Sequence, residues 1–163
     1  MKAMTRANYS EEILNQVVAA LRTALGDRLM AVVLFGSQAR GEAREDSDWD
    51  VLVIAEELPE DPLERGHLLR QLLPIPCRVA ISFLARTPQE FEGHLSSLYL
   101  DIALDGQILY DPKGYAEERL STLRRRIEEA GLFRKKTPAG EFWRWRTPPR
   151  GRWTMSWERI GEA

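Results

Sequence analysis

Residues Leu34–Val53, LFGSQARGEAREDSDWDVLV, decide the fold of this chain of 163 residues. The stretch begins inside an apolar run, Leu29–Phe35, that is too short for a typical helix and rich enough in valine for a buried strand. Gly36 and Ser37 follow directly, and a second apolar run, Trp49–Ala55, begins after a polar segment. The stretch therefore predicts two strands that are joined through a glycine-serine turn and a charged loop.

The first half of this stretch has the composition of a phosphate-binding turn. A strand that passes into a short helix at Gly36 and Ser37 presents backbone N–H groups, and Gly36 has no side chain to obstruct a phosphate. Ser37 adds a hydroxyl donor. Arg40, one turn further, is placed to reach the same anion, and Gly41 lets the chain leave the helix.

The second half places two carboxylates at the start of a strand. Asp48 and Asp50 are two residues apart, so they share one face of the strand with their Cα atoms about 7 Å apart, while Trp49 points to the other face. Two carboxylates and a triphosphate supply the hard oxygen ligands that Mg²⁺ prefers. Taken singly, a Gly-Ser pair is usually a turn and an Asp-x-Asp pair a solvated edge. Their conjunction predicts a site for phosphoryl transfer with metal ions.

This segment resembles the signature of the DNA polymerase beta-like nucleotidyltransferase superfamily, in which a hydrophobic residue and Gly-Ser precede Asp-hydrophobic-Asp-hydrophobic. Here ten residues separate Ser37 from Asp48. The further run Gly-Ser-Gln-Ala-Arg-Gly is similar to the minimal nucleotidyltransferases, small proteins that are often paired, as antitoxins, with a HEPN-domain protein. The resemblance implies that Asp48 and Asp50 are the catalytic residues and ligate Mg²⁺. It also implies that Gly36, Ser37 and Arg40 hold the nucleotide phosphates.

The chain departs from this family at the third carboxylate, which catalytic members usually carry on a later strand. The expected position is near Ser82, with Ala80 as the other candidate on that face, and no Asp or Glu occurs in residues 65–89. A missing general base costs about 10²- to 10⁴-fold in rate. Asp101, Asp105 or an acid from a partner are the candidates to replace it.

The remaining patterns predict a mixed α/β domain of the α+β type. The nucleotidyltransferase fold that the resemblance implies has a small mixed sheet with helices packed mainly on one face. Helices are expected from Ser10, as N-cap, to Gly26 and, beyond the Leu34–Val53 stretch, at three further places. The first runs from Asp61-Pro62 to Leu73. The second begins at the capping box Thr87-Pro88-Gln89-Glu90, and the helical stretch that follows it ends at Gly106. The third is a charged helix at Tyr115–Ala130. Further strands are expected at Arg78–Ala85 and Gln107–Tyr110.

Residues 131–163 differ from the rest in charge and composition. They hold eight Lys/Arg against three Glu, a balance of +5, so residues 1–130 carry −7 of the total of −2. Aromatic residues alternate with arginines but show no regular period, so we expect a nucleotidyltransferase-like domain over 1–130 and a basic, aromatic extension over 131–163. The extension is expected to be flexible or folded back. Tryptophan and arginine suit packing on its own domain or a second copy of the chain, and also nucleic acid, with protein packing favoured because free tryptophans would form a sticky surface.

Composition excludes several classes of protein. Cys77 is the single cysteine, and no Cys/His cluster is present to bind zinc, which fits a reducing cytoplasm. No apolar run approaches the roughly 20 residues of a membrane span, and the first residues do not have the pattern of a signal peptide. A cytoplasmic protein without a membrane partner is expected.

Two functions follow from these observations. The first is an Mg²⁺-dependent nucleotidyltransferase that moves a nucleoside monophosphate from ATP or another NTP to a hydroxyl, with a HEPN-domain toxin as the acceptor that the resemblance implies. The second is a catalytically degenerate nucleotidyltransferase fold that neutralises a partner by contact through its extension. Small-molecule acceptors stay open, as does assembly into a homo-oligomer through the extension.

Overall fold

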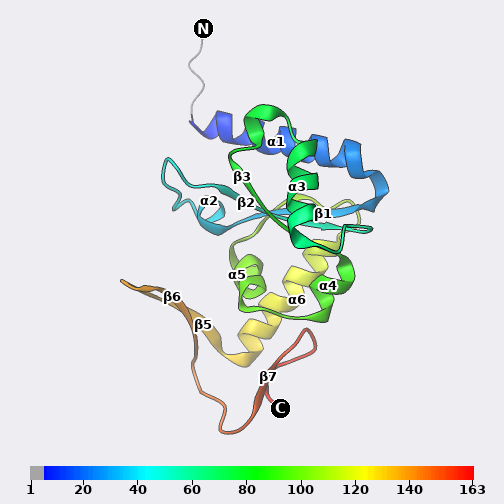
Figure 1. The fold of residues 1–163 in the computed structure, drawn as a ribbon. Coiled ribbons are helices and arrows are strands. Elements are labelled where there is room, and N and C mark those ends of the chain that lie inside the picture. The colour runs from blue at the N-terminus through cyan, green and yellow to red at the C-terminus, as the bar shows by residue number, and fades with distance from the viewer. Residues whose placement is uncertain (1–5) are drawn as a thin grey trace.

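The computed structural model describes the backbone of residues 6–163 and the side chains from Glu11 onward. An α/β body is followed by a C-terminal extension at the lower end of the molecule (Figure 1). The helices are α1 Arg6–Leu25, α2 Gly36–Arg40, α3 Pro62–Leu72, α4 Pro88–Gly93, α5 Ser97–Asp105 and α6 Tyr115–Ala130, with 3-10 turns at Gly26–Arg28 and Ile75–Cys77. The strands are β1 Leu29–Phe35, β2 Trp49–Ala55, β3 Ile81–Arg86, β4 Gln107–Tyr110, β5 Leu132–Thr137, β6 Gly140–Trp145, β7 Trp153–Met155 and β8 Ile160–Glu162.

The main sheet has the order β3-β2-β1-β4 within the described residues. Strand β1 pairs antiparallel with β2 and β4, whereas β2 pairs parallel with β3, so the predicted small mixed sheet is confirmed. The register places Phe35 opposite Asp50 and Asp50 opposite Ser82. The end of β1 and the starts of β2 and β3 therefore meet at the same edge of the sheet.

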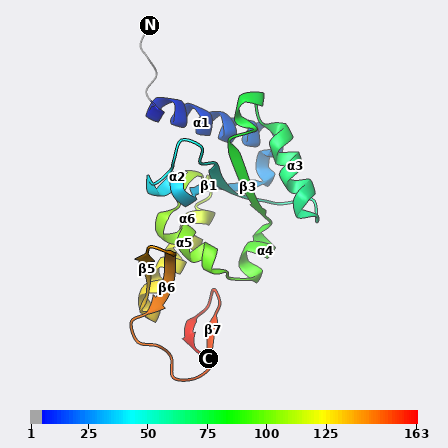
Figure 2. The same ribbon diagram turned by 60° about the vertical axis from the view of Figure 1, so that its left-hand side comes forward.

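Helices cover both faces of this sheet, so the expectation that they pack mainly on one face is wrong. Val32, Val51 and Val53 point into a core with α1 and α3, and the alternate residues Val33 and Leu52 point into a second core with α4, α5 and α6. Figure 2 shows α1 and α3 on one side of the strands and α4, α5 and α6 on the other. The reason is that β1 and β2 are continuous apolar runs, and such strands are buried on both faces.

Most of the predicted elements are confirmed, with shifts at two boundaries. The capping box at the start of α4 is present, because Thr87 Oγ1 accepts from the Glu90 N–H at 3.2 Å and Glu90 Oε2 accepts from the Thr87 N–H at 2.9 Å. Ser10 does not begin the first helix, which starts at Arg6, because serine is tolerated inside helices. Strand β3 starts at Ile81 rather than Arg78, because turn hydrogen bonds occupy the backbone between Ile75 and Ala80.

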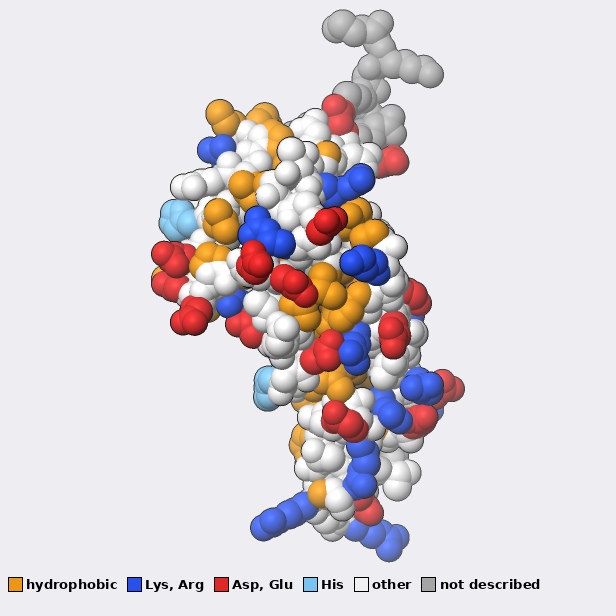
Figure 3. All heavy atoms as spheres, turned by 90° about the vertical axis from the view of Figure 1, so that its right-hand side faces the viewer, with side chains coloured by type: hydrophobic (Ala, Val, Ile, Leu, Met, Phe, Trp, Pro, Cys, Tyr) orange, Lys and Arg blue, Asp and Glu red, His pale blue; other side chains and the backbone are white. Residues whose placement is uncertain are grey.

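The C-terminal extension is ordered and folds back onto the body. It forms two antiparallel hairpins, β5–β6 and β7–β8, in a segment whose sequence shows no regular period. Trp157 is 8% exposed, donates its Nε1–H to the Phe91 carbonyl at 3.0 Å, and packs on the Phe91 ring with centroids 5.0 Å apart. Basic side chains are frequent at this lower end of the molecule (Figure 3). The extension thus covers the core beneath α4 and α5, and the domain boundary at residue 130 stays a prediction.

Two findings concern the single cysteine and the hydrophobicity of the helices. Cys77 is free and buried. Within residues 6–163, no helix is both long and apolar enough to cross a lipid bilayer.

Candidate active site

Gly36 and Ser37 lie where β1 ends and α2 begins, as predicted for the phosphate-binding turn. Gly36 has φ +73°, in the left-handed region that favours glycine. A Cβ atom at Gly36 would overlap Asp50 Oδ2 and lie 3.3 Å from Asp50 Cγ. Glycine at this position therefore lets the backbone of the turn pack directly against the carboxylate of Asp50.

Asp48 and Asp50 lie at the start of β2, beside this turn. Asp48 is exposed and immediately precedes the strand, whereas Asp50 is half-buried. Trp49 packs with the α1 and α3 core on the opposite face, as expected. Burial raises the pKa of Asp50, and the nearby charge of Asp48 raises it further. The two carboxylates thus concentrate negative charge at a partly desolvated point, which a cation would stabilise.

Ser82 occupies the place where a third carboxylate is expected. It pairs with Asp50 across the parallel β2–β3 ladder, and its side chain contributes a hydrogen bond that works against the rise in the Asp50 pKa. Of the two candidates, Ser82 and Ala80, the structure therefore places Ser82 opposite Asp50.

The two candidate replacements for this carboxylate, Asp101 and Asp105, are engaged elsewhere. Both lie on α5. Asp101 accepts from Trp143 Nε1–H at 3.1 Å, and Asp105 accepts two hydrogen bonds from Arg134, at 2.5 and 2.7 Å. Burial raises the pKa of Asp101, and Arg134 partly offsets this. Both carboxylates are thus already paired with side chains of the C-terminal extension, and a role as the missing base stays a prediction.

Arg40 lies at the end of α2 and acts on the same site. Its positive charge lowers the pKa of Asp50, against the effects of burial and Asp48. The guanidinium donates from Nε to Glu42 Oε2 at 3.0 Å, and its Nη1 lies 3.8 Å from Asp105 Oδ2. Arg40 thus lies close enough to Asp50 to act on its charge, and it is shared with two further carboxylates. Its contact with phosphate stays a prediction.

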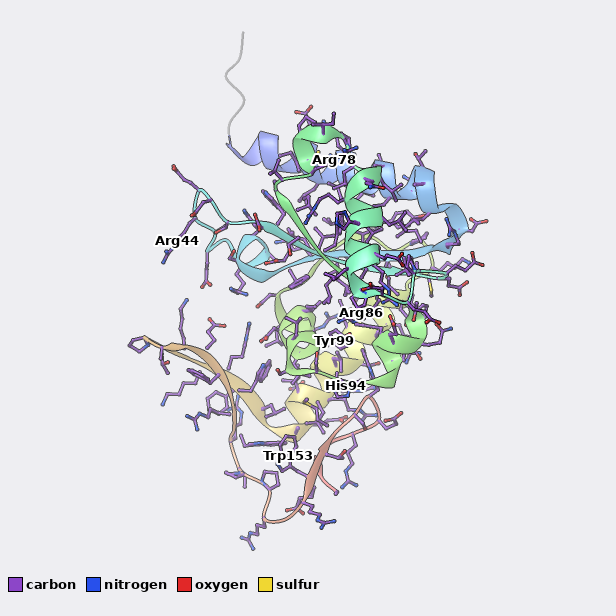
Figure 4. The ribbon with its side chains drawn as sticks, viewed as in Figure 1. Arg44, Arg78, Arg86, His94, Tyr99 and Trp153 are labelled. Atoms are coloured by element: carbon purple, nitrogen blue, oxygen red, sulfur yellow. The ribbon has the colours of Figure 1, made fainter. Side chains whose placement is uncertain are left out.

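The hairpin β5–β6 contributes charged residues that the sequence analysis did not single out. Arg134 pairs with Asp105, and Lys136 donates to Glu42 Oε1 at 2.7 Å. The β5–β6 hairpin runs below α5, on the side of the molecule where α2 and Arg44 lie (Figure 4). The sequence signal for these residues was the two-residue spacing of Leu132, Arg134 and Lys136, which places all three on one face of a strand. It was missed because the hairpin itself was not predicted.

The donor set at this edge has the chemistry of a shared magnesium site. Asp48 and Asp50 offer hard carboxylate oxygens on one face of a strand, which suits a cation that takes its other ligands from phosphate and water. No cluster of three His, Cys, Asp or Glu able to hold a metal ion is found where the structure describes the side chains. The residues present therefore fit an ion that binds together with a nucleotide better than a site made by protein alone.

A groove of about 760 Å³ lies between α1, α2 and the β1–β4 edge of the sheet. Its walls come from α1, β1, α2, the loop after α2, the start of β2, and β4, and they include Gln38, Gly41, Trp49 and Gln107. Asp48 and Asp50 do not line it, because Trp49 points to the opposite face of β2. We therefore assign the candidate chemistry to the Gly36–Asp50 edge and not to this groove.

The family model for the polymerase beta nucleotidyltransferases matches residues 16–113, which contain the turn, both aspartates and Arg40. A Methanocaldococcus jannaschii protein named "Putative protein adenylyltransferase MJ1305" is 32% identical over 76% of this chain and 89% of its own length. "Protein adenylyltransferase MntA" of Thermococcus cleftensis is 47% identical over 35% of this chain and 56% of its own length. The chain therefore belongs to the polymerase beta-type nucleotidyltransferase family, in its minimal nucleotidyltransferase group.

Crystal structures confirm the fold. A toxin-antitoxin structure with AMP-PNP matches at a TM-score of 0.50 and 21% identity, over 71% of this chain and 90% of that chain. A mutant of the toxin-antitoxin MntA-HpeT matches at a TM-score of 0.53 and 18% identity, over 71% of this chain and 87% of that chain. The α/β nucleotidyltransferase fold predicted from the sequence is thus confirmed.

Gly36→Ala is expected to damage the site more than a matched substitution at Gly41. Both glycines have left-handed φ, +73° and +71°, but a Cβ at Gly41 would meet nothing within 4 Å. The left-handed backbone alone costs about 1–2 kcal/mol for a residue with a Cβ, and overpacking adds about 1–3 kcal/mol. We therefore expect Gly36→Ala to lower the free energy of unfolding by about 3 kcal/mol and Gly41→Ala by about 1 kcal/mol, as measured by urea unfolding. Equal losses would show that the Asp50 carboxylate moves aside from the new methyl group at little cost in stability.

Proposed function

We propose that this chain is an Mg²⁺-dependent nucleotidyltransferase that moves the AMP group of ATP to a hydroxyl on a HEPN-domain toxin. The observation that carries the proposal is the single edge of the sheet at which the Gly36 turn, the Asp48–Asp50 pair and Arg40 meet. Of the curated relatives, one is named a putative protein adenylyltransferase and one a protein adenylyltransferase, and two crystal structures that share the fold are of toxin-antitoxin assemblies. Both findings support a protein acceptor.

The residues at this edge have distinct roles in the proposed reaction. Gly36 and Ser37 hold the phosphates through backbone N–H groups and the serine hydroxyl, and Arg40 adds a charged donor. Asp48 and Asp50 hold Mg²⁺, which when bound stabilises negative charge on the phosphate oxygens.

The transfer itself is an in-line displacement at the α-phosphorus. The acceptor hydroxyl oxygen forms a bond to that atom, the bond to the bridging oxygen of the β-phosphate breaks, and pyrophosphate leaves. The hydroxyl proton passes to solvent or to a base of the acceptor protein, since Ser82 stands where a carboxylate base is expected. The nucleotide, the metal ion and a cytoplasmic setting are parts of this proposal.

One observation favours a second function, in which the chain neutralises a partner by contact alone. Ser82 cannot act as the third carboxylate, and the extension exposes aromatic groups, with Trp153 54% and Phe142 46% exposed. Trp157 is buried in the body and Trp143 is half-buried against Asp101, which reduces the aromatic surface available to an outside partner. A homo-oligomer through the extension and binding of nucleic acid stay predictions.

The test is transfer of label from ATP radioactive at the α-phosphate to a HEPN-domain protein encoded beside this chain, with and without Mg²⁺. Label on the partner that requires Mg²⁺ supports the enzyme. Binding of the partner without any label supports the contact module instead. ATP radioactive at the γ-phosphate is the control, because its label leaves with pyrophosphate and must not appear on the acceptor.

Ser82→Asp is expected to raise the rate of this transfer. The new carboxylate would lie beside Asp50, where it can take a proton from the acceptor or help to hold metal, and general-base catalysis contributes about 10²-fold or more. Ser82→Ala is the matched control, because it removes the hydroxyl without adding a carboxylate. If initial rates of labelling are the same for both variants, the missing carboxylate does not limit the reaction.

A further inference from the structure

Arg40, the cation beside Asp50, lies between two carboxylates that compete with a phosphate for its charge. Its Nε donates to Glu42 Oε2 at 3.0 Å, and its Nη1 lies 3.8 Å from Asp105 Oδ2. The side chain of Asp105 is 15% exposed, so its charge is only weakly screened by water. If these carboxylates had no other partner, they would draw the Arg40 guanidinium away from a bound nucleotide.

Both carboxylates are engaged by cations of the β5–β6 hairpin. Arg134 donates to both oxygens of Asp105, from Nη1 at 2.5 Å and Nη2 at 2.7 Å, in the bidentate geometry that makes arginine-carboxylate pairs strong. Lys136 donates to Glu42 Oε1 at 2.7 Å. The side chain of Lys136 is 70% exposed, so its ion pair with Glu42 contributes little free energy. Arg134 therefore provides most of the neutralisation of the two carboxylates.

The position of Arg134 is fixed by its own surroundings. Its guanidinium also lies 3.5 Å from Asp101 Oδ1 and 3.4 Å from Glu141 Oε2, and 5.9 Å from the centroid of the Trp143 ring. Trp143 in turn donates to Asp101, which ties both strands of the hairpin to α5. Several contacts thus hold Arg134 over Asp105, and Arg134 belongs to a segment outside the family match at residues 16–113.

We propose that Arg134, with a smaller contribution from Lys136, is a positioning residue for the nucleotide site. It neutralises Asp105 and so leaves the positive charge of Arg40 available to the phosphates of ATP. This inference rests on the proposed function, in which Arg40 binds phosphate. The C-terminal hairpin is then part of the nucleotide site, acting through α5, in addition to covering the core.

The test compares binding of ATP with Mg²⁺ by titration calorimetry in the full chain and three variants. Arg134→Gln is expected to weaken the binding of ATP about tenfold, because one partly buried charge interaction is lost. The double variant Arg134→Gln with Asp105→Asn is expected to bind within about threefold of the wild type, because the carboxylate that competes for Arg40 is also gone. Arg144→Gln is the matched control. It removes one positive charge from the exposed side of the same hairpin, opposite Phe133.

Rescue by the second substitution separates positioning from a structural role. Thermal unfolding of each variant reports how much the substitution destabilises the fold. If Arg134 had only a structural role, the double variant would bind ATP no more tightly than Arg134→Gln. That result, or unchanged binding in Arg134→Gln, overturns the inference and leaves the proposed function intact. A wild-type chain that does not bind ATP with Mg²⁺ overturns both.

Discussion

Asp50→Asn is expected to lower the rate of adenylyl transfer about 10³-fold, within the range by which single catalytic groups act. Asp50 is the half-buried member of the carboxylate pair and packs against Gly36, so it is the acid closest to the proposed phosphate turn. Asparagine keeps the shape but removes the charge, and a neutral oxygen is a much weaker ligand for Mg²⁺. The measurement is the initial rate of label transfer from ATP radioactive at the α-phosphate.

The matched control for this variant is Asp46→Asn. Asp46 is exposed in the same loop and is not part of the site, so the change in net charge is the same and the rate should stay within about twofold of the wild type. Because burial and Asp48 raise the pKa of Asp50, ionising this carboxyl costs more free energy in the metal-free fold than in the unfolded chain. We therefore expect the melting temperature of metal-free Asp50→Asn to equal or exceed that of the wild type. A variant that melts normally and keeps a tenth of the rate or more would remove Asp50 from the mechanism.

Glu90→Gln is expected to lower the free energy of unfolding by about 2–3 kcal/mol at neutral pH. Arg65 is 4% exposed and donates to both oxygens of Glu90, from Nη1 at 2.6 Å and from Nη2 at 2.8 Å. Removing one partner of a buried pair costs about 3–5 kcal/mol, and the side chain of Glu90 is 42% exposed, which reduces the figure. For a chain of this size the melting temperature should fall by about 6–10 °C.

The pH dependence of this effect has a defined sign. Hydrogen bonds from Arg65 lower the pKa of Glu90 from 4.5 to about 2. A lowered pKa in the folded state gives stability that is present above pH 4.5 and is lost as the pH falls from 4.5 toward 2. The difference in unfolding free energy between the wild type and Glu90→Gln should therefore be constant near neutral pH and shrink below pH 4.5. Glu128→Gln, an exposed change on α6, should differ from the wild type by about 0.5 kcal/mol or less at every pH. A difference for Glu90→Gln that does not depend on pH would show that the ion pair is not its source.

The residues of the candidate site could be predicted from the sequence because they lie close together in the chain. Gly36, Ser37, Arg40, Asp48 and Asp50 fall within fifteen residues, and a turn between two paired strands brings them to one edge of the sheet. The position near Ser82 could be predicted as well, by counting back from the helix start at Thr87-Pro88, with Ala80 left as the other candidate, and the strand ladder then places Ser82 opposite Asp50. Local spacing and strand periodicity were sufficient for these positions.

Packing between distant segments could not be predicted in the same way. The two-sided core depends on which helices return to which face of the sheet, and the expectation of one covered face was wrong. The pairs Arg134–Asp105 and Lys136–Glu42 join residues 29 and 94 positions apart. No local pattern selects one carboxylate among the many on the surface as the partner of a given cation.

The sequence by itself determined the family, the strands and turn of the site, the two aspartates and the absence of a third acid on β3. These features follow from residue type and short spacing, which constrain the backbone directly. Only the tertiary structure decided that Asp101 and Asp105 are already engaged, that the extension forms hairpins, and that its cations reach the carboxylates beside Arg40. Such contacts depend on the closure of long loops, and the free energy that selects them comes from packing of the whole chain.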